Sequence, residues 1–258
     1  NNYEYSSGEK AGDIAIVEAS LTRAAELNYK LNNYALAKQQ FEQIVKSAKT
    51  TKNSRIALWF GLRSAYKVSD YQFIIANYRK YIEAEFGNEQ RTIEVEFMAA
   101  KSAEKLNKKH RAIALYTSIN GRTQSEKSAI SLYRISSILY EDKRIDTAEV
   151  VIFQLVNHTP TYDKWLAKGL ILLSDIYVLR EDYFQARATL ESIVKNYQGS
   201  DEILEEARNK LNMLNELETM SSAPILDSNQ VDEIEFDSKY DELFEEEEPI
   251  EEEIPGMK

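Results

Sequence analysis

The residues that enzymes use for catalysis or metal binding are few and scattered in this chain. No cysteine occurs among its 258 residues, and its two histidines, His110 and His158, each lie alone in a predicted turn. The chain has no glycine-rich phosphate loop, no G-x-S-x-G elbow and no H-E-x-x-H zinc motif. The acidic run at 245–248 lacks the glycine and the alternating ligands of a dedicated calcium site. The sequence therefore predicts a protein without catalytic activity, metal or cofactor.

Charge is distributed unevenly along the chain. The net charge is −11, yet residues 223–258 alone carry fourteen Asp or Glu against Lys239 and Lys258. The rest of the chain is close to neutral, so it lacks the general basic face that nucleic-acid binding requires. No run of 18 apolar residues is present, so no transmembrane segment is expected and membrane association would come through partners or a lost anchor.

Five segments of the chain share one pattern of apolar residues around a short polar turn. On each side of the turn, apolar residues recur at i, i+3, i+4 and i+7, which is typical of amphipathic helices. One anchor residue follows each turn, at successive intervals of 37, 38, 36 and 38 residues: Ala37, Ile74, Ala112, Ala148 and Ala186. Regular intervals of this length predict a repeat of helix hairpins.

Buried positions can be predicted relative to these anchors. Four residues after each anchor stands a large apolar group: Phe41, Tyr78, Tyr116, Ile152 and Leu190. Seven residues after it stands another: Ile44, Tyr81, Ile119, Leu155 and Ile193. Twelve residues before it the side chain is small in four units (Ala25, Ala100, Ser136 and Ser174) and is Leu62 in the remaining one. Small residues at this position allow the two helices of a hairpin to approach closely.

The pattern resembles the tetratricopeptide repeat, which has a small residue at position 8, Tyr at 17, Ala at 20, an aromatic residue at 24 and Pro at 32. The fifth unit matches through Ser174, Tyr177, Tyr183 and Ala186, and the fourth unit supplies Pro160. The resemblance covers roughly residues 13–198, with Ile74 in place of one anchor alanine. The longer units and the acidic end are also similar to repeat proteins of the Gram-negative cell envelope.

This resemblance implies an all-α, right-handed superhelical solenoid of about five helix hairpins, closed by a capping helix at 201–220. In the family, the first helix of each hairpin lines a concave groove. Transferred to this sequence, the groove residues are Tyr29, Lys30, Trp59, Arg63, Tyr66, Lys67, Phe97, Lys101, Lys105, Tyr133 and Tyr140. Aromatic residues and Arg are enriched at binding hot spots, although several of these rings could instead pack between adjacent hairpins.

One peptide-binding mode of the family is absent from the sequence. The family's best-known clamp holds a C-terminal carboxylate with Lys and Asn at positions 5 and 9 of its first unit. Here these positions are Thr22 and Glu26. The sequence therefore predicts a different kind of peptide or protein partner.

Three regions are expected along the chain: a flexible N-terminal arm (1–12), the repeat solenoid with its cap (13–220), and an acidic, disordered tail (221–258). Apolar residues interrupt the acidic tail and define a possible binding motif: Ile234, Phe236, Tyr240, Leu243 and Phe244. The tail is either a solubilising segment or a peptide that binds the basic, aromatic groove, in cis or from a second copy.

The sequence thus predicts a non-catalytic scaffold that binds other proteins or peptides through the groove. The resemblance to envelope proteins favours a part in a larger assembly of the bacterial periplasm or cell envelope, with the cytoplasm as the other location. Two alternatives stay open: a spacer or regulatory subunit that continues a longer repeat array, and an RNA-binding helical repeat.

Overall fold

The computed structural model describes residues 16, 19–47, 51–84 and 88–221, where it contains helices and turns but no strand. This confirms the all-α class. Two units divide the chain, Asn1–Glu216 and Leu217–Lys258. The predicted arm at 1–12 and the tail from residue 222 onward lie outside the described residues. The same holds for the tail motif Ile234, Phe236, Tyr240, Leu243 and Phe244.

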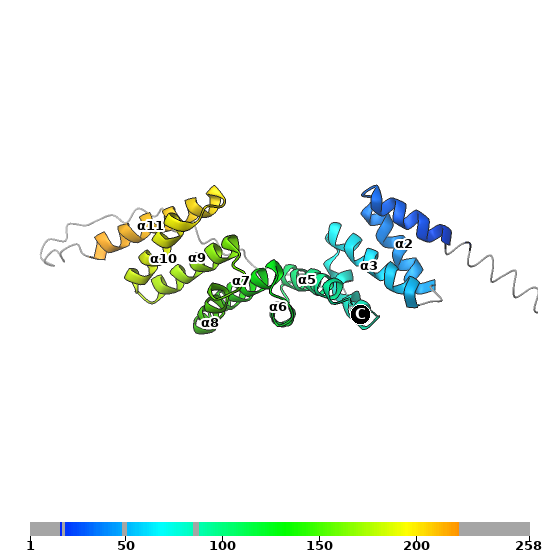
Figure 1. The fold of residues 1–258 in the computed structure, drawn as a ribbon, viewed down its shortest axis with the longest axis horizontal. Helices are drawn as coiled ribbons and strands as arrows, with labels where there is room; N and C mark the ends of the chain where they lie inside the picture. Colours follow the sequence, from blue (N-terminus) through cyan, green and yellow to red (C-terminus); the bar gives the residue numbers. More distant parts are fainter. Residues whose placement is uncertain (1–15, 17–18, 48–50, 85–87, 222–258) are drawn as a thin grey trace, which may run out of the picture. The chain divides into compact units, whose positions relative to one another are not determined.

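The described helices form five consecutive hairpins and one further helix (Figure 1). The hairpins are residues 19–30 with α2 (Tyr34–Ser47), α3 (Thr51–Lys67) with α4 (Tyr71–Ala84), α5 (Glu89–Lys105) with α6 (Lys109–Asn120), α7 (Glu126–Glu141) with α8 (Ile145–Val156), and α9 (Asp163–Leu179) with α10 (Tyr183–Asn196). The last helix, α11, spans Asp201–Ser221, where the sequence predicts a capping helix.

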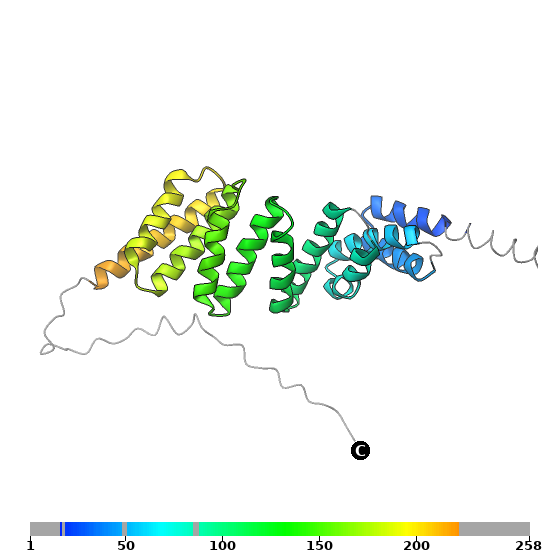
Figure 2. The same cartoon turned by 60° about the horizontal axis from the view of Figure 1, so that its bottom comes forward.

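Each helix packs mainly against its neighbours in the sequence, from α2 against α3 through α9 against α10. The green helices α6, α7 and α8 show this side-by-side arrangement in Figure 2. First helices of adjacent hairpins also touch, α3 with α5 and α7 with α9. A protein built in this way buries its apolar surface between neighbouring repeats, as the sequence interval predicts.

The positions that the repeat pattern predicts as core are buried. All five anchors, including Ile74 in its alanine position, are fully inaccessible to solvent. The residues four and seven positions later are at most 4% exposed, and the residues twelve positions earlier at most 1%. At Gly169 the helix α9 comes so close to α8 that a Cβ atom would lie 2.8 Å from Leu155 Cδ2.

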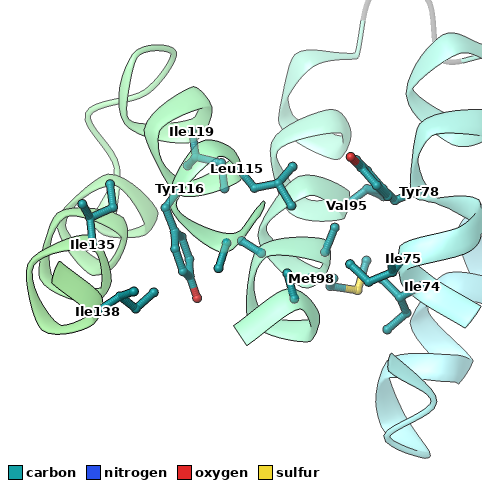
Figure 3. Packing of buried hydrophobic residues seen from close by; sticks show 14 of the residues in the cluster. Ile74, Ile75, Tyr78, Val95, Met98, Leu115, Tyr116, Ile119, Ile135 and Ile138 are labelled. Carbon is teal, nitrogen blue, oxygen red and sulfur yellow. The ribbon is translucent and has the colours of Figure 1, made fainter. Parts of the chain in front are cut away.

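The main hydrophobic cluster runs without interruption through consecutive hairpins. Figure 3 shows Ile74, Ile75 and Tyr78 of α4 facing Val95 and Met98 of α5. On the other side, Leu115, Tyr116 and Ile119 of α6 pack between α5 and α7, where Ile135 and Ile138 continue the cluster. The second helices α4, α6 and α8 are therefore each covered on two sides by first helices, which are the helices that carry the predicted groove residues.

The turn within each hairpin has one recurring geometry. A residue with left-handed backbone lies five positions before each anchor: Asn32, Ser69, Asn107, Lys143 and Glu181, with φ between 52° and 63°. In the fourth hairpin, Arg144 N–H donates to Leu139 C=O at 2.9 Å and Lys143 N–H to Tyr140 C=O at 2.9 Å. This pair of hydrogen bonds is the Schellman motif, which satisfies the last carbonyls of a helix.

Candidate binding groove

Five of the predicted groove residues line one depression, with a volume of about 390 Å³. Tyr66 comes from α3, Phe97, Lys101 and Lys105 from α5, and Tyr133 from α7. The remaining lining residues are Tyr71, Glu104, Tyr116, Ile130, Arg134, Trp165 and Lys168. We call this set of residues the basic-aromatic groove.

The aromatic rings of the groove are anchored in the core yet partly accessible. Phe97 packs edge-on against the buried Tyr116, with 6.1 Å between ring centroids. Tyr133 lies 5.6 Å from Trp165 of α9. Tyr66, Phe97, Tyr133 and Trp165 are all half-buried. Packing between hairpins and partial exposure to solvent therefore coexist in the same side chains.

Cations lie next to these rings. The Lys101 ammonium is 5.8 Å from the Tyr66 ring centre and 5.7 Å from that of Phe97. The Lys168 ammonium is 5.8 Å from Tyr133 and 6.0 Å from Trp165. Within the described part of the chain, Lys101, Lys105 and Lys168 form no ion pair with a carboxylate. Among the described residues, the ammonium groups of Lys101 and Lys168 therefore have ring faces as neighbours, and that attraction is weak.

The other two charged residues of the groove are already paired. Arg134 Nε donates to Glu104 Oε2 at 3.1 Å, and the same oxygen accepts from the Tyr116 hydroxyl at 3.0 Å. This network joins α5, α6 and α7. Burial of the Tyr116 ring raises the pKa of its hydroxyl, so it stays protonated and donates. Glu104 and Arg134 therefore hold adjacent hairpins together.

Trp59 lies in a separate depression of about 370 Å³, with Arg55, Arg91 and Tyr81 among the lining residues. Its ring packs 5.6 Å from Tyr81, and Arg63 and Arg91 lie 5.1 and 5.4 Å from its centre. The sequence places Trp59 and Tyr66 in one groove, whereas in the structure they line different depressions.

Arg63 joins three successive first helices. Its Nε donates to the Tyr29 hydroxyl at 2.9 Å, and a second nitrogen pairs with Glu94 of α5 at 2.7 Å. Burial alone would lower the pKa of Arg63, but Tyr29 and Glu94 hold that pKa above its ordinary value. Tyr29 itself packs on Phe60 at 5.1 Å. Arg63 and Tyr29 each contact a neighbouring repeat. These contacts account for an Arg and a Tyr at these positions without a binding partner.

The remaining predicted residues lie apart from the basic-aromatic groove. Lys30 is exposed near the end of the first helix, and the Lys67 ammonium lies 5.9 Å from the Tyr34 ring. Tyr140 packs against the main core cluster, where burial and the charge of Asp175 raise the pKa of its hydroxyl. These residues remain predictions as binding residues.

The sequence pattern does not place Trp165 in the groove. The transferred family positions begin after it, although it stands three residues before Lys168 and therefore on the same face of α9. Its ring nitrogen donates to Glu126 of α7 at 2.9 Å. The spacing to Lys168 was the signal that could have found it.

One of the two histidines differs from its predicted surroundings, whereas His158 lies in the linker between α8 and α9 as predicted. His110 lies in the first turn of α6 and not in a loop. His158 is 7% exposed, donates from Nδ1 to the Pro160 carbonyl at 2.8 Å and lies 3.0 Å from Ser128 Oγ through Nε2. Throughout the described ranges, no three His, Asp or Glu residues gather as metal ligands. No described helix has the length and apolar character needed to cross a bilayer.

The fold and the groove define an all-α protein of stacked helix hairpins. A family model described as tetratricopeptide repeat matches residues 19–51 and 169–200, the first and last hairpins. The three hairpins between them keep the same interval, turn geometry and buried positions. The chain therefore contains tetratricopeptide repeats, as its sequence predicts. Repeats of this kind generally form protein-interaction scaffolds.

Two solved structures are similar to the chain. One is Bacillus thuringiensis PlcR in complex with the peptide PapR7 and DNA, with 14% identity and a TM-score of 0.37 over 79% of this chain and 71% of that chain. The other is the tetratricopeptide-repeat domain of P58(IPK), with 14% identity and a TM-score of 0.38 over 86% and 71%. No curated protein matches the sequence significantly.

Proposed function

We propose that this chain is a non-catalytic scaffold that binds an acidic, aromatic peptide segment of a partner protein in the basic-aromatic groove. One observation carries the proposal: Lys101 and Lys168 lie beside partly accessible aromatic rings, Lys105 lines the same groove, and none of the three has a carboxylate partner in the described residues. Such a surface has both its charges and its ring faces available for a ligand.

The groove favours an anionic ligand for electrostatic reasons. Four cationic side chains and one anionic side chain line it. Carboxylates of a peptide can pair with the lysines, while its aromatic residues can pack on Tyr66, Phe97, Tyr133 or Trp165. Rigid aromatic surface binds with little loss of rotamer freedom, and complementary charge speeds encounter. An acidic peptide with Phe or Tyr every few residues combines both features.

The chain itself contains a segment with this chemistry. Residues 232–244 read DEIEFDSKYDELF, with six acidic residues, Lys239 and three aromatic residues. This segment lies outside the described residues, so its part in the proposal rests on sequence alone. We propose it as a competitor for the groove, in cis or from a second copy.

The test is binding of a fluorescently labelled DEIEFDSKYDELF peptide, followed by anisotropy at low salt. We expect Lys101→Glu with Lys105→Glu to weaken binding by about tenfold or more, because two attractive charges become repulsive. The matched control is Lys80→Glu with Lys195→Glu, which makes the same charge change at exposed sites on α4 and α10. Equal loss in both double variants would contradict the proposal.

Two further measurements separate the alternatives. A chain ending at Ser221 should bind the labelled peptide more tightly than the full chain if the tail competes for the groove. A single-stranded RNA oligonucleotide should fail to displace the peptide. Displacement by RNA would favour the RNA-binding alternative, and absence of peptide binding to either chain would favour a spacer or regulatory subunit.

A place in a bacterial cell-envelope assembly is a separate proposal. It is supported only by the longer repeat units and the acidic end of the sequence. Fractionation of the native cells, with detection of the chain in cytoplasmic and envelope fractions, tests it directly.

A further inference from the structure

The first hairpin contains a hollow that is larger than the corresponding depression beside Trp59 in the second hairpin. Its volume is about 490 Å³, and it is bounded by the first helix, α2 and the start of α3. Phe41, Ile44 and Ala57 are buried at its floor, while Thr22, Glu26 and Ile56 are half-buried around it. The floor is therefore apolar and the hollow falls within the size range of small-ligand pockets.

One residue of the repeat accounts for the larger size of this hollow. Fifteen positions before each later anchor stands a large apolar side chain: Trp59, Phe97, Tyr133 and Ile171. The same position of the first hairpin, fifteen residues before Ala37, is Thr22. A threonine has far less volume than these side chains, and close packing requires something to fill the difference.

The contacts of Trp59 and Phe97 show where a large side chain at the position of Thr22 would lie. Trp59 packs against Tyr81, seven residues after its anchor, and the corresponding residue of the first hairpin is Ile44. Phe97 packs against Tyr116, four residues after its anchor, which corresponds to Phe41. Both Ile44 and Phe41 line the hollow beside Thr22.

A third contact agrees with this placement. Tyr133 packs against Trp165 of the next hairpin, which lies twenty-one residues before the anchor Ala186. Trp59 is contacted in the same way by Arg91, which lies twenty-one residues before the anchor Ala112. The corresponding residue for the first hairpin is Asn53, which also lines the hollow. The hollow thus has the surroundings of an aromatic side chain on three sides.

We infer that the hollow beside Thr22 binds an aromatic side chain of a partner protein, in the place that Trp59, Phe97 and Tyr133 occupy in their own hairpins. The inference rests on the proposed role of the chain as a protein-binding scaffold and adds a second recognition point to it. Arg23 and Glu26 at the rim carry opposite charges, so the hollow selects for apolar shape rather than for acidic residues. The partner would present a Trp, Phe or Tyr that is separate from the acidic residues bound in the basic-aromatic groove.

The experiment uses 5-fluoroindole as the probe, added to the full chain and followed by 19F NMR and by the methyl resonances of Ile44 and Ile56. We expect saturable binding with a Kd of roughly 1 mM, since a ligand this small has few atoms to contribute. Thr22→Trp should abolish binding by occupying the place of the probe ring and should raise the thermal unfolding midpoint by roughly 2–4 °C. Thr22→Phe is the smaller variant and should weaken binding about tenfold.

The control is Thr147→Trp, which places the same side chain on the exposed surface of α8 and should leave probe binding unchanged. The inference is overturned if the unmodified chain shows no saturable shift at Ile44 and Ile56, as would happen if residues 1–15 of the chain already filled the hollow. Equal binding to the Thr22→Trp and Thr147→Trp variants would also overturn it. Because the probe carries no charge, its result is independent of the peptide test on Lys101 and Lys105.

Discussion

At the scale of single residues, Asp70 has two partners in the turn between α3 and α4. One carboxylate oxygen accepts from the Phe73 N–H at 3.0 Å and so caps the start of α4. The other pairs with Lys38 of α2 at 2.5 Å. Burial alone would raise the pKa of Asp70, but the hydrogen bonds from Lys38 and from Phe73 lower it below its ordinary value. The ionised form is therefore the one that the fold stabilises.

The stabilisation by Asp70 should depend on pH. A lowered pKa in the folded state means that the contribution is fully present above the unfolded-state pKa and is lost as the pH falls through the folded-state pKa. We expect Asp70→Asn to lower the thermal unfolding midpoint at pH 7, and the difference from the unmodified chain to shrink below about pH 4. Calorimetry at several pH values measures it. A difference that does not change with pH would show that the charge of Asp70 is irrelevant.

At the scale of the element, the hairpin turn depends on one residue with left-handed backbone. Lys143 and Glu181 occupy this position in the fourth and fifth hairpins with φ of 59°. Side chains with a Cβ atom are strained in this region, whereas glycine is not. The turn is nevertheless kept, because its two hydrogen bonds satisfy helix carbonyls that would otherwise lack a donor.

Replacing Lys143 by glycine should therefore stabilise the protein. We expect Lys143→Gly to raise the free energy of unfolding by about 0.5–1 kcal/mol, measured by urea denaturation. The control, Glu191→Gly at an exposed position within α10, should lower it by about 1 kcal/mol. If Lys143→Gly destabilised the chain as much as the control does, the geometry of this turn would not limit stability.

At the scale of the whole molecule, the contacts of the unit Asn1–Glu216 are mainly between neighbours. From α2 to α10 each helix contacts the next helix in the sequence, and among first helices α3 contacts α5 and α7 contacts α9. Ion pairs follow the same rule, as Lys109 with Asp142 at 2.7 Å and Lys210 with Asp175 at 2.6 Å show. Stability in such a chain is close to a sum of local terms.

A core mutation in one hairpin should consequently leave distant hairpins nearly unaffected. Leu190 of α10 is 1% exposed, and we expect Leu190→Ala to lower local stability by about 2–5 kcal/mol. Hydrogen exchange followed by mass spectrometry should show faster exchange in α9 and α10 and unchanged exchange in α3 and α4. Val150→Ala, at a position 58% exposed, is the control. Uniformly faster exchange would show a single cooperative unit instead.

The regular features of the fold could be predicted from the sequence because each depends on local spacing. The anchor positions from Ala37 to Ala186 mark buried sites directly, since an amphipathic helix hides the same face in every repeat. Ile74 takes the anchor position despite its different type, because its place in the interval and not its size determines its burial. Lys101 and Lys105 were placed in the groove by the same register.

Other features depended on contacts between hairpins, which spacing alone does not reveal. The sequence pattern groups Arg63 with Lys101. In the structure Tyr29 and Glu94 bind the Arg63 guanidinium, whereas no carboxylate of the described residues pairs with Lys101. Trp165 enters the groove because α9 packs against α7. Pairing of charges is decided by which side chains meet across helices far apart in the sequence.

The sequence by itself determined the helix hairpins, their interval and their buried faces, since these follow from the chemistry of residues a few positions apart. Only the tertiary structure decided which aromatic and charged side chains have an accessible side, and that the space beside Thr22 stays open. Accessibility is a property of the neighbours from adjacent repeats and not of the residue alone. Burial within a helix face is local, whereas a free surface requires that no other repeat covers it.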